Sequence, residues 1–280
     1  MAINSSDRLS KVYNKYSSVL NTPLLKELKK RPRICEFIFI FSVWTVLAYI
    51  FDGSALPYPH EVLYGTWQVL TEGNVWTHIS YTFTSTFIAF FITMAIGIVM
   101  GISMATNEYG TKLFLPYVVI GLSVPAIAWA AIATLIYGIG IVVPILSAIL
   151  VMYPIVALII WKGVEDIDAN RIQMSDSFDI SRRRMVRRII LPEIAPTLFA
   201  SSRYGLAVGW KIVTIAEIFA GSRGIGYMII LTFDQFQWSR TWAWAVIFIG
   251  IVLFIEYAIF QPLEKRAYKY KEAEMYTAMG

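Results

Sequence analysis

Six long apolar stretches constrain the fold of this 280-residue sequence more than any other feature. A helix that crosses the roughly 30 Å hydrocarbon core of a bilayer needs about 20 mostly apolar residues. The stretches lack the polar alternation that is typical of barrel strands, so helices are the expected form. They predict an all-α integral membrane protein with transmembrane helices near residues 35–51, 79–105, 113–137, 141–161, 196–220 and 241–261.

Composition excludes most other classes of protein. Hydrophobic residues make up 57% of the chain and charged residues only 15%, against about 25% charged in soluble domains. The single cysteine, Cys35, permits no internal disulfide, and two histidines, His60 and His78, leave little room for a metal site. The net charge of +5 comes from basic residues beside apolar runs, which does not favour nucleic acid binding.

The positions of the 24 Lys and Arg residues predict the orientation of the chain. Eight precede the first apolar stretch, seven lie in segment 162–193 and four in the C-terminal tail, whereas segment 52–78 has none. Positive residues near span ends stay in the cytoplasm, and no signal peptide is recognisable. We therefore expect a basic cytoplasmic tail (1–34), one transmembrane domain (35–262) with a cytoplasmic loop (162–193), and a cytoplasmic C-terminal tail (263–280).

Segment 162–193 is predicted to form a helix, a turn and a second helix. Ala169–Phe178 can form a short helix, and Asp179 begins a break. Ser181 is a suitable N-cap for a second helix that ends near Leu191, with Pro192 stopping it or starting the next span.

Three consecutive arginines, Arg182, Arg183 and Arg184, occupy the first turn of that second helix. The helix dipole disfavours cations there by about 0.3–1 kcal/mol each, so a compensating anion is expected. Two interpretations stay open: anionic lipid headgroups, which also fit the positive-inside pattern, or an acidic protein surface docked on the loop.

This loop resembles the cytoplasmic "EAA" segment in the membrane subunits of ABC importers. Ile189, Leu191 and Pro192 match the second half of that motif in register. The alanine-containing triplet falls on residues 173–175 and its glycine on Asp179, so neither is retained. Aspartate adopts the left-handed conformation of the glycine at some cost, which predicts a docking loop that is kept but altered.

Flanking motifs extend the resemblance over about residues 57–263, to the permeases for nitrate, sulfonates and taurine. The ordered matches are Pro125, Ala128, Tyr137, Gly138, Gly140, Pro154, Gly163, Val164, Leu191, Pro192, Pro196, Arg203, Trp210, Lys211, Ala216, Glu217, Gly224, Gly226 and Tyr227. One departure is Ala131, where those permeases commonly have proline.

The resemblance implies a type I ABC importer permease fold of six helices, with N- and C-termini cytoplasmic, in the cytoplasmic (inner) membrane. Expected partners are ATP-binding cassette subunits, a second permease copy (identical or related), an extracytoplasmic substrate-binding protein and the lipid bilayer, with no nucleic acid. The chain itself would bind no cofactor, and ATP and Mg would bind the ATPase subunits. Expected coupling residues are Gln173, Met174, Ser175, Phe178, Asp179, Ile189, Leu191 and Pro192.

Charged residues inside the fifth span are candidates for a translocation pathway, because a charge at the bilayer centre needs a cavity or a partner. Arg203 and Lys211 share one helix face and would attract an anionic or polar solute, while Glu217 lies on another face. The full candidate set is Arg203, Lys211, Glu217, Pro125 and Trp129. The alternative is a structural role, in which these residues satisfy helix-end carbonyls or the basic ones pair with Glu193 and Glu256 in the bundle. The resemblance favours that structural role for Arg203 and Glu217, because permeases with different substrates share them, while for Lys211 both interpretations stay open.

The predicted function is therefore a non-catalytic permease subunit that passes a small polar solute, expected to be an anion such as nitrate, a sulfonate, taurine or bicarbonate. The sequence has no Walker-type lysine and no paired catalytic groups. A stand-alone secondary transporter or channel for a small anion is the alternative. The pair Gly97 and Gly101 predicts close helix packing.

Overall fold

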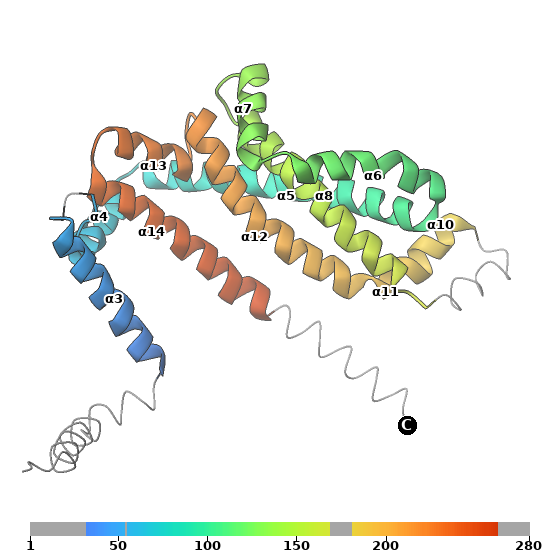
Figure 1. Cartoon of the computed structure of the whole chain (residues 1–280), viewed down its shortest axis with the longest axis horizontal. Helices are drawn as coiled ribbons and strands as arrows, with labels where there is room; N and C mark the ends of the chain where they lie inside the picture. The colour runs from blue at the N-terminus through green and yellow to red at the C-terminus, as the bar shows by residue number, and fades with distance from the viewer. Residues whose placement is uncertain (1–31, 54, 169–180, 263–280) are drawn as a thin grey trace, which may run out of the picture. The chain divides into compact units, whose positions relative to one another are not determined.

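The computed structural model describes residues 32–53, 55–168 and 181–262, and these residues form helices and connecting turns without a strand (Figure 1). The chain divides into two compact units, residues 1–64 and residues 65–280. In the first unit, α3 (Pro32–Ile50) is mostly apolar, with Arg33 and Glu36 near its start. The Trp44 Nε1–H donates to the Pro57 carbonyl at 3.1 Å, which fixes the turn that leads into α4 (Pro59–Thr71).

The second unit is built around three long helices: α5 (Val75–Thr106), α8 (Val142–Glu165) and α12 (Ala195–Ala220). Each packs against the other two, while α6 and α7 also pack against α8, and α13 packs against α12 and α14. One core cluster joins Ala89 of α5 to Met152 of α8 and Val213 of α12. Because the outward side chains are also apolar, as Phe91 and Val99 of α5 illustrate, the bundle suits lipid surroundings.

Small residues bring α5 and α8 together. A Cβ atom on Gly97 would lie 2.5 Å from Val156 Cγ1, and one on Gly101 would lie 2.7 Å from the Ala157 carbonyl oxygen. Neither position has room for a larger residue. The close packing predicted from this glycine pair is confirmed, and it follows the small-residue rule for helices in membranes.

The prediction of one continuous spanning helix over residues 113–137 is wrong. The chain forms α6 (Glu108–Ser123) and α7 (Ala126–Tyr137), which meet at a 99° bend. Val124 takes an extended conformation (φ −83°, ψ 125°). This is the preferred state of a residue before proline, and Pro125 also lacks the N–H that would continue the helix.

A second bend, of 47°, separates α12 from α13 (Ile225–Asp234). The last spanning segment consists of α14 (Trp238–Phe254) and η2 (Ile255–Phe260). By length and apolar composition, three described helices can cross a membrane, or five segments if each bent pair is one span, and Cys35–Ile50 is a shorter apolar helix. The multi-span helical architecture is thus present, while the count of six and the orientation stay predictions.

The first helix predicted in the cytoplasmic loop, Ala169–Phe178, lies outside the described residues. The second begins, as predicted, directly after Ser181, with α10 (Arg182–Met185), η1 (Val186–Ile190) and α11 (Leu191–Glu193) in continuous succession. The helix widens in η1, where the Leu191 N–H bonds to the Val186 carbonyl five residues back. Pro192 explains the widening, because its ring would clash with the carbonyl four residues earlier in a regular α-helix.

Candidate translocation and coupling site

Glu217 lies at the bend between α12 and α13 and is completely buried. Its Oε2 accepts hydrogen bonds from the Gly226 N–H at 3.0 Å and from the Thr82 hydroxyl at 2.9 Å. Thr82 Oγ1 in turn accepts the Ile225 N–H at 2.8 Å. Side chains of α12 and α5 therefore satisfy the first backbone donors of α13, which have no partner inside their own helix. We call Glu217, Thr82 and the amides of residues 224–226 the buried polar cluster.

Glycines allow the carboxylate of Glu217 to reach these amides. Gly224 has a positive φ of 115°, and a Cβ atom there would collide with the Glu217 carboxyl group. A Cβ atom on Gly226 would collide with the Thr214 carbonyl oxygen and lie 2.9 Å from Glu217 Cβ. Gly224 and Gly226, both among the residues matched in the sequence, thus leave the space that the buried Glu217 side chain occupies.

His78 of α5 completes the buried polar cluster at its outer edge. Its Nδ1 accepts the Gly224 N–H at 3.2 Å, and its ring stacks on Tyr227 and meets Trp244 edge-on. Glu217 Oε1 has no hydrogen-bond partner among the described residues. The structure therefore places Glu217 as a brace for the bend, while the predicted pathway role for this residue stays a prediction.

Arg203 forms an ion pair with Glu256 of η2, so the pairing considered from the sequence is present. Both side chains are about two-thirds buried, with exposures of 34% and 28%. The pair joins α12 to the last helix across a sequence separation of 53 residues. Because its charge is balanced, Arg203 adds little net positive potential to its surroundings.

Lys211 differs from Arg203 although both lie on α12. Its side chain is exposed, and it forms no hydrogen bond or ion pair with any residue that the structure describes. At 1.5 Å per residue it lies about 24 Å from the start of α12 and about 14 Å from its end. An uncompensated ammonium group thus occupies the interior of a spanning helix.

The other predicted pathway residues, Pro125 and Trp129, lie at the bend between α6 and α7. Pro125 is exposed and Trp129 half-buried, with the Trp129 Nε1–H lacking a partner among the described residues. The helix α7, which carries Trp129, also packs against α12, which carries Lys211.

Three predicted coupling residues are described by the structure. Ile189 and Leu191 pack on a core cluster that includes Ile160 and Val164 of α8, while Pro192 is exposed. The remaining five, at positions 173–175, 178 and 179, lie outside the described residues.

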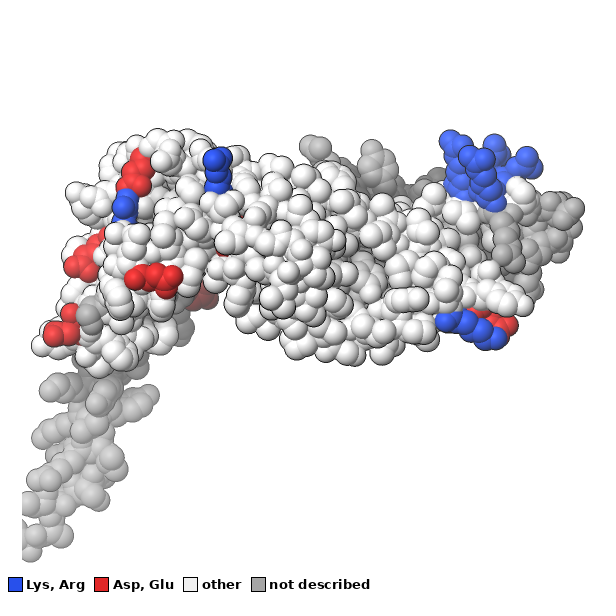
Figure 2. Space-filling model, turned by 90° about the horizontal axis from the view of Figure 1, so that it is seen from above, with Lys and Arg blue, Asp and Glu red and all other residues white. Residues whose placement is uncertain are grey.

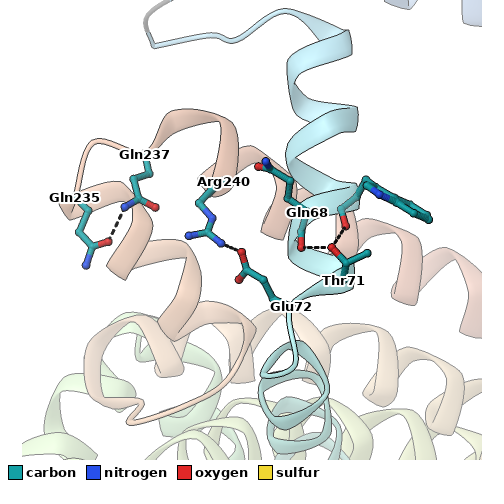
Figure 3. Close-up of polar contacts among 7 residues, drawn as sticks. Gln68, Thr71, Glu72, Gln235, Gln237 and Arg240 are labelled. Atoms are coloured by element: carbon teal, nitrogen blue, oxygen red, sulfur yellow. Dashed lines mark hydrogen bonds and ion pairs between the residues drawn. The ribbon is translucent and has the colours of Figure 1, made fainter.

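An ion pair that the sequence did not reveal joins Arg240 at the start of α14 to Glu72, which follows α4 (Figure 3). Beside it, the Gln237 side-chain amide donates to Gln235 Oε1 at 3.0 Å, and the Thr71 hydroxyl donates to the Gln68 carbonyl at 2.8 Å. These contacts anchor the ends of α4, α13 and α14. No group of three or more metal-ligating side chains occurs among the described residues.

A bundle of long apolar helices with a few charged side chains inside its spans is typical of a membrane permease. The family described as "Binding-protein-dependent transport system inner membrane component" matches residues 94–266, and the chain belongs to this family. It is an ABC importer permease of the nitrate, sulfonate and taurine type.

Two curated relatives and one solved structure illustrate the match. The taurine transport system permease protein TauC of Escherichia coli is 27% identical over 68% of this chain and 72% of its own length. The nitrate import permease protein NrtB of a Synechocystis species is 25% identical over 79% of this chain and 83% of its own. The inward-facing MetNI methionine ABC transporter shares the fold, with a TM-score of 0.54, 19% identity, and coverage of 73% of this chain and 95% of the other. The relatives are permease subunits, which supports the expectation that this chain is not an enzyme.

Proposed function

We propose that this permease carries a small anionic solute, of the nitrate, sulfonate, taurine or bicarbonate kind, and that Lys211 supplies the positive charge of the pathway. The observation that carries the proposal is the exposed, unpaired ammonium group of Lys211 in the interior of α12. Exposure of that charge to lipid would cost several kcal/mol, by insertion scales about 3 kcal/mol at the bilayer centre. A water-filled path that holds anions removes this cost.

Arg203 and Lys211 have different roles in this proposal. Arg203 is balanced by Glu256 and holds two helices together, so it supplies no net charge to a solute. Lys211 remains available, and its three donors suit the oxygen atoms of nitrate or sulfonate groups. The names of the relatives, which include taurine and nitrate permeases, agree with an anionic or zwitterionic solute.

The proposed complex contains two permease chains, two cytoplasmic ATP-binding subunits that hold ATP and Mg, and an extracytoplasmic binding protein. In each permease, six spans place both termini in the cytoplasm and present loop 162–193 to an ATPase subunit. Closure of the ATPase subunits would move the loops and rock the bundles between inward-open and outward-open states. The direct passage from η1 through α11 into α12 supports this mechanism, because a push on the loop would reach the helix that carries Lys211.

Uptake measurements test the solute assignment. In proteoliposomes with the complete complex, Lys211→Met should raise the KM for labelled taurine or nitrate about tenfold or more, since a charge-assisted contact contributes about 1.5–3 kcal/mol. Lys211→Arg should keep most uptake. Lys112→Met is the matched control, because Lys112 pairs with Glu108 on an exposed surface. Unchanged KM in Lys211→Met would refute the pathway role.

Coupling requires a separate experiment. Met174→Pro should abolish the stimulation of ATP hydrolysis by solute while the chain still inserts and co-purifies with the ATP-binding subunit. Full stimulation in this variant would count against the loop assignment. Failure of the wild-type chain to co-purify with any ATP-binding subunit would favour the alternative, a transporter or channel that works alone.

A further inference from the structure

Four arginines lie on one side of α10 and η1: Arg183, Arg184, Arg187 and Arg188, here called the arginine face. All four side chains are exposed, and none forms an ion pair or hydrogen bond with a residue that the structure describes. Their spacing of one, four and five residues places them on one helical face. In Figure 2 the largest blue patch lies at the end of the bundle that holds these helices, with no red beside it on the side shown.

The opposite side of the same helix is apolar and buried. Met185 is 8% exposed and Ile190 fully buried, and both belong to a core cluster with Ile160 and Val164 at the end of α8. This packing prevents the helix from rotating. The arginine face therefore keeps one fixed direction relative to the ends of the spanning helices.

The arginine face also lies close in sequence to the start of α12, which carries one of the apolar spans. Arg188 precedes Ala195, the first residue of the spanning helix α12, by seven residues. Seven residues of helix rise about 10 Å, and the break at Ile194 (φ −86°, ψ 6°) shortens or redirects this path. A long arginine side chain keeps its charged end in polar surroundings while its stem lies along apolar surface, so guanidinium groups beside the end of a span are suited to contact lipid phosphates.

The composition of the arginine face favours lipid over a protein partner. Tight protein interfaces need buried apolar or aromatic anchors at their centre. Here Met185 and Ile190 are buried in the bundle, and Val186 and Ile189 are half-buried against it, so residues 183–190 present no exposed apolar anchor beside the arginines. Attraction to an anionic membrane surface needs only charge, and the planar guanidinium matches phosphate oxygens in bidentate geometry.

We infer that the arginine face binds the phosphate groups of anionic phospholipids at the membrane surface that faces the loop. Bound headgroups would also balance the cations in the first turn of α10, which the helix dipole disfavours. The proposal concerns a ligand of this chain alone and holds independently of the transported solute.

Lipid titration of the purified full-length chain tests the inference. The probes are phosphatidylglycerol and phosphatidylcholine, each with a fluorophore on the acyl chain. Arg187→Gln with Arg188→Gln should weaken phosphatidylglycerol binding about 25-fold, since each cation contributes a factor of about five. Phosphatidylcholine binding should not change. Lys162→Gln is the matched control at the same end of the bundle, because Lys162 already pairs with Glu165 at 2.7 Å.

Two results would overturn the inference. Equal phosphatidylglycerol affinity in the wild type and in the double variant would show that the arginine face does not bind lipid. Loss of the ATP-binding subunit from the variant, with lipid affinity intact, would assign the face to a protein partner. The charge-preserving variant Arg187→Lys with Arg188→Lys must restore binding. Elution of the glutamine double variant as a folded, monodisperse particle shows that its weaker binding comes from the lost charges and not from unfolding.

Discussion

Glu217→Ala is expected to destabilise the bundle although the residue contacts no charged partner within the described part of the chain. The substitution leaves the buried Gly226 N–H without its acceptor and removes the bond from the Thr82 hydroxyl. A buried donor without a partner costs about 1–3 kcal/mol. The emptied volume adds about 1–2 kcal/mol, because a packed site relaxes only in part.

Together these terms predict a loss of about 3 kcal/mol. For a chain of this size, that corresponds to a fall in melting temperature of about 6–12 °C. Glu217→Gln keeps an oxygen that accepts both hydrogen bonds, so its melting temperature should stay within a few degrees of the wild type. The contrast between the two variants separates loss of the acceptor from loss of the carboxylate charge.

Thermal unfolding of the purified chain in detergent, followed by the loss of the monodisperse elution peak, measures the effect. Thr82→Val supplies a second perturbation, because it removes the hydroxyl that accepts the Ile225 N–H. Thr93→Val is the matched control on the same helix, since Thr93 is equally buried and its hydroxyl has no described partner. We expect Thr82→Val to lower the melting temperature and Thr93→Val to leave it unchanged.

The reasoning fails if Glu217→Ala melts with the wild type, because the buried polar cluster would then contribute nothing to stability. Equal destabilisation by Glu217→Gln would also refute it, since charge rather than the accepted hydrogen bonds would then matter.

Two further predictions concern the packing of the bundle. Arg203→Met alone should destabilise the protein by about 1–3 kcal/mol, which is below the range for fully buried ion pairs because both partners are partly exposed. Adding Glu256→Gln should recover part of this loss. A double-mutant cycle of melting temperatures checks the coupling, and additive effects of the two substitutions would contradict the ion pair. Gly97→Leu should prevent stable packing of α5 on Val156, whereas Gly250→Leu in α14, where a Cβ atom meets nothing within 4 Å, should be tolerated. Yield of monodisperse protein distinguishes them, and comparable yields would contradict the packing argument.

Much of the architecture could be predicted because apolar length alone defines a spanning helix. The predicted stretch 196–220 corresponds to α12 (Ala195–Ala220), and the stretch 141–161 begins one residue before α8 and otherwise lies within it. The stretch 113–137 misled because both halves of a bent pair are apolar, so composition does not change at the break. Pro125 marks the break, because a proline disfavours the helical conformation of the residue before it, here Val124.

The candidate site was harder to predict than the spans. The ion pair of Arg203 was considered because two opposite charges in a membrane seek each other, and the structure contains it. Thr82 was missed, because one threonine in an apolar helix carries no distinctive pattern. Its role depends on Glu217, which follows 135 residues later, and only the tertiary packing brings the two together. The polar residues Ser85, Thr86 and Thr93 on the buried side of the same helix were the available indication.

The buried polar cluster also has a consequence for biogenesis. The leading amides of α13 find their acceptors on α12, which immediately precedes them, and on Thr82 of α5, which lies 143 residues before Ile225 in the chain. Until α5 and α12 pack together, the backbone N–H groups of residues 224–226 would lack acceptors, and inserting them into lipid without partners is strongly disfavoured. Insertion of this segment must therefore wait for the assembly of α5 with α12, and translation of α13 becomes a late checkpoint in the maturation of the chain.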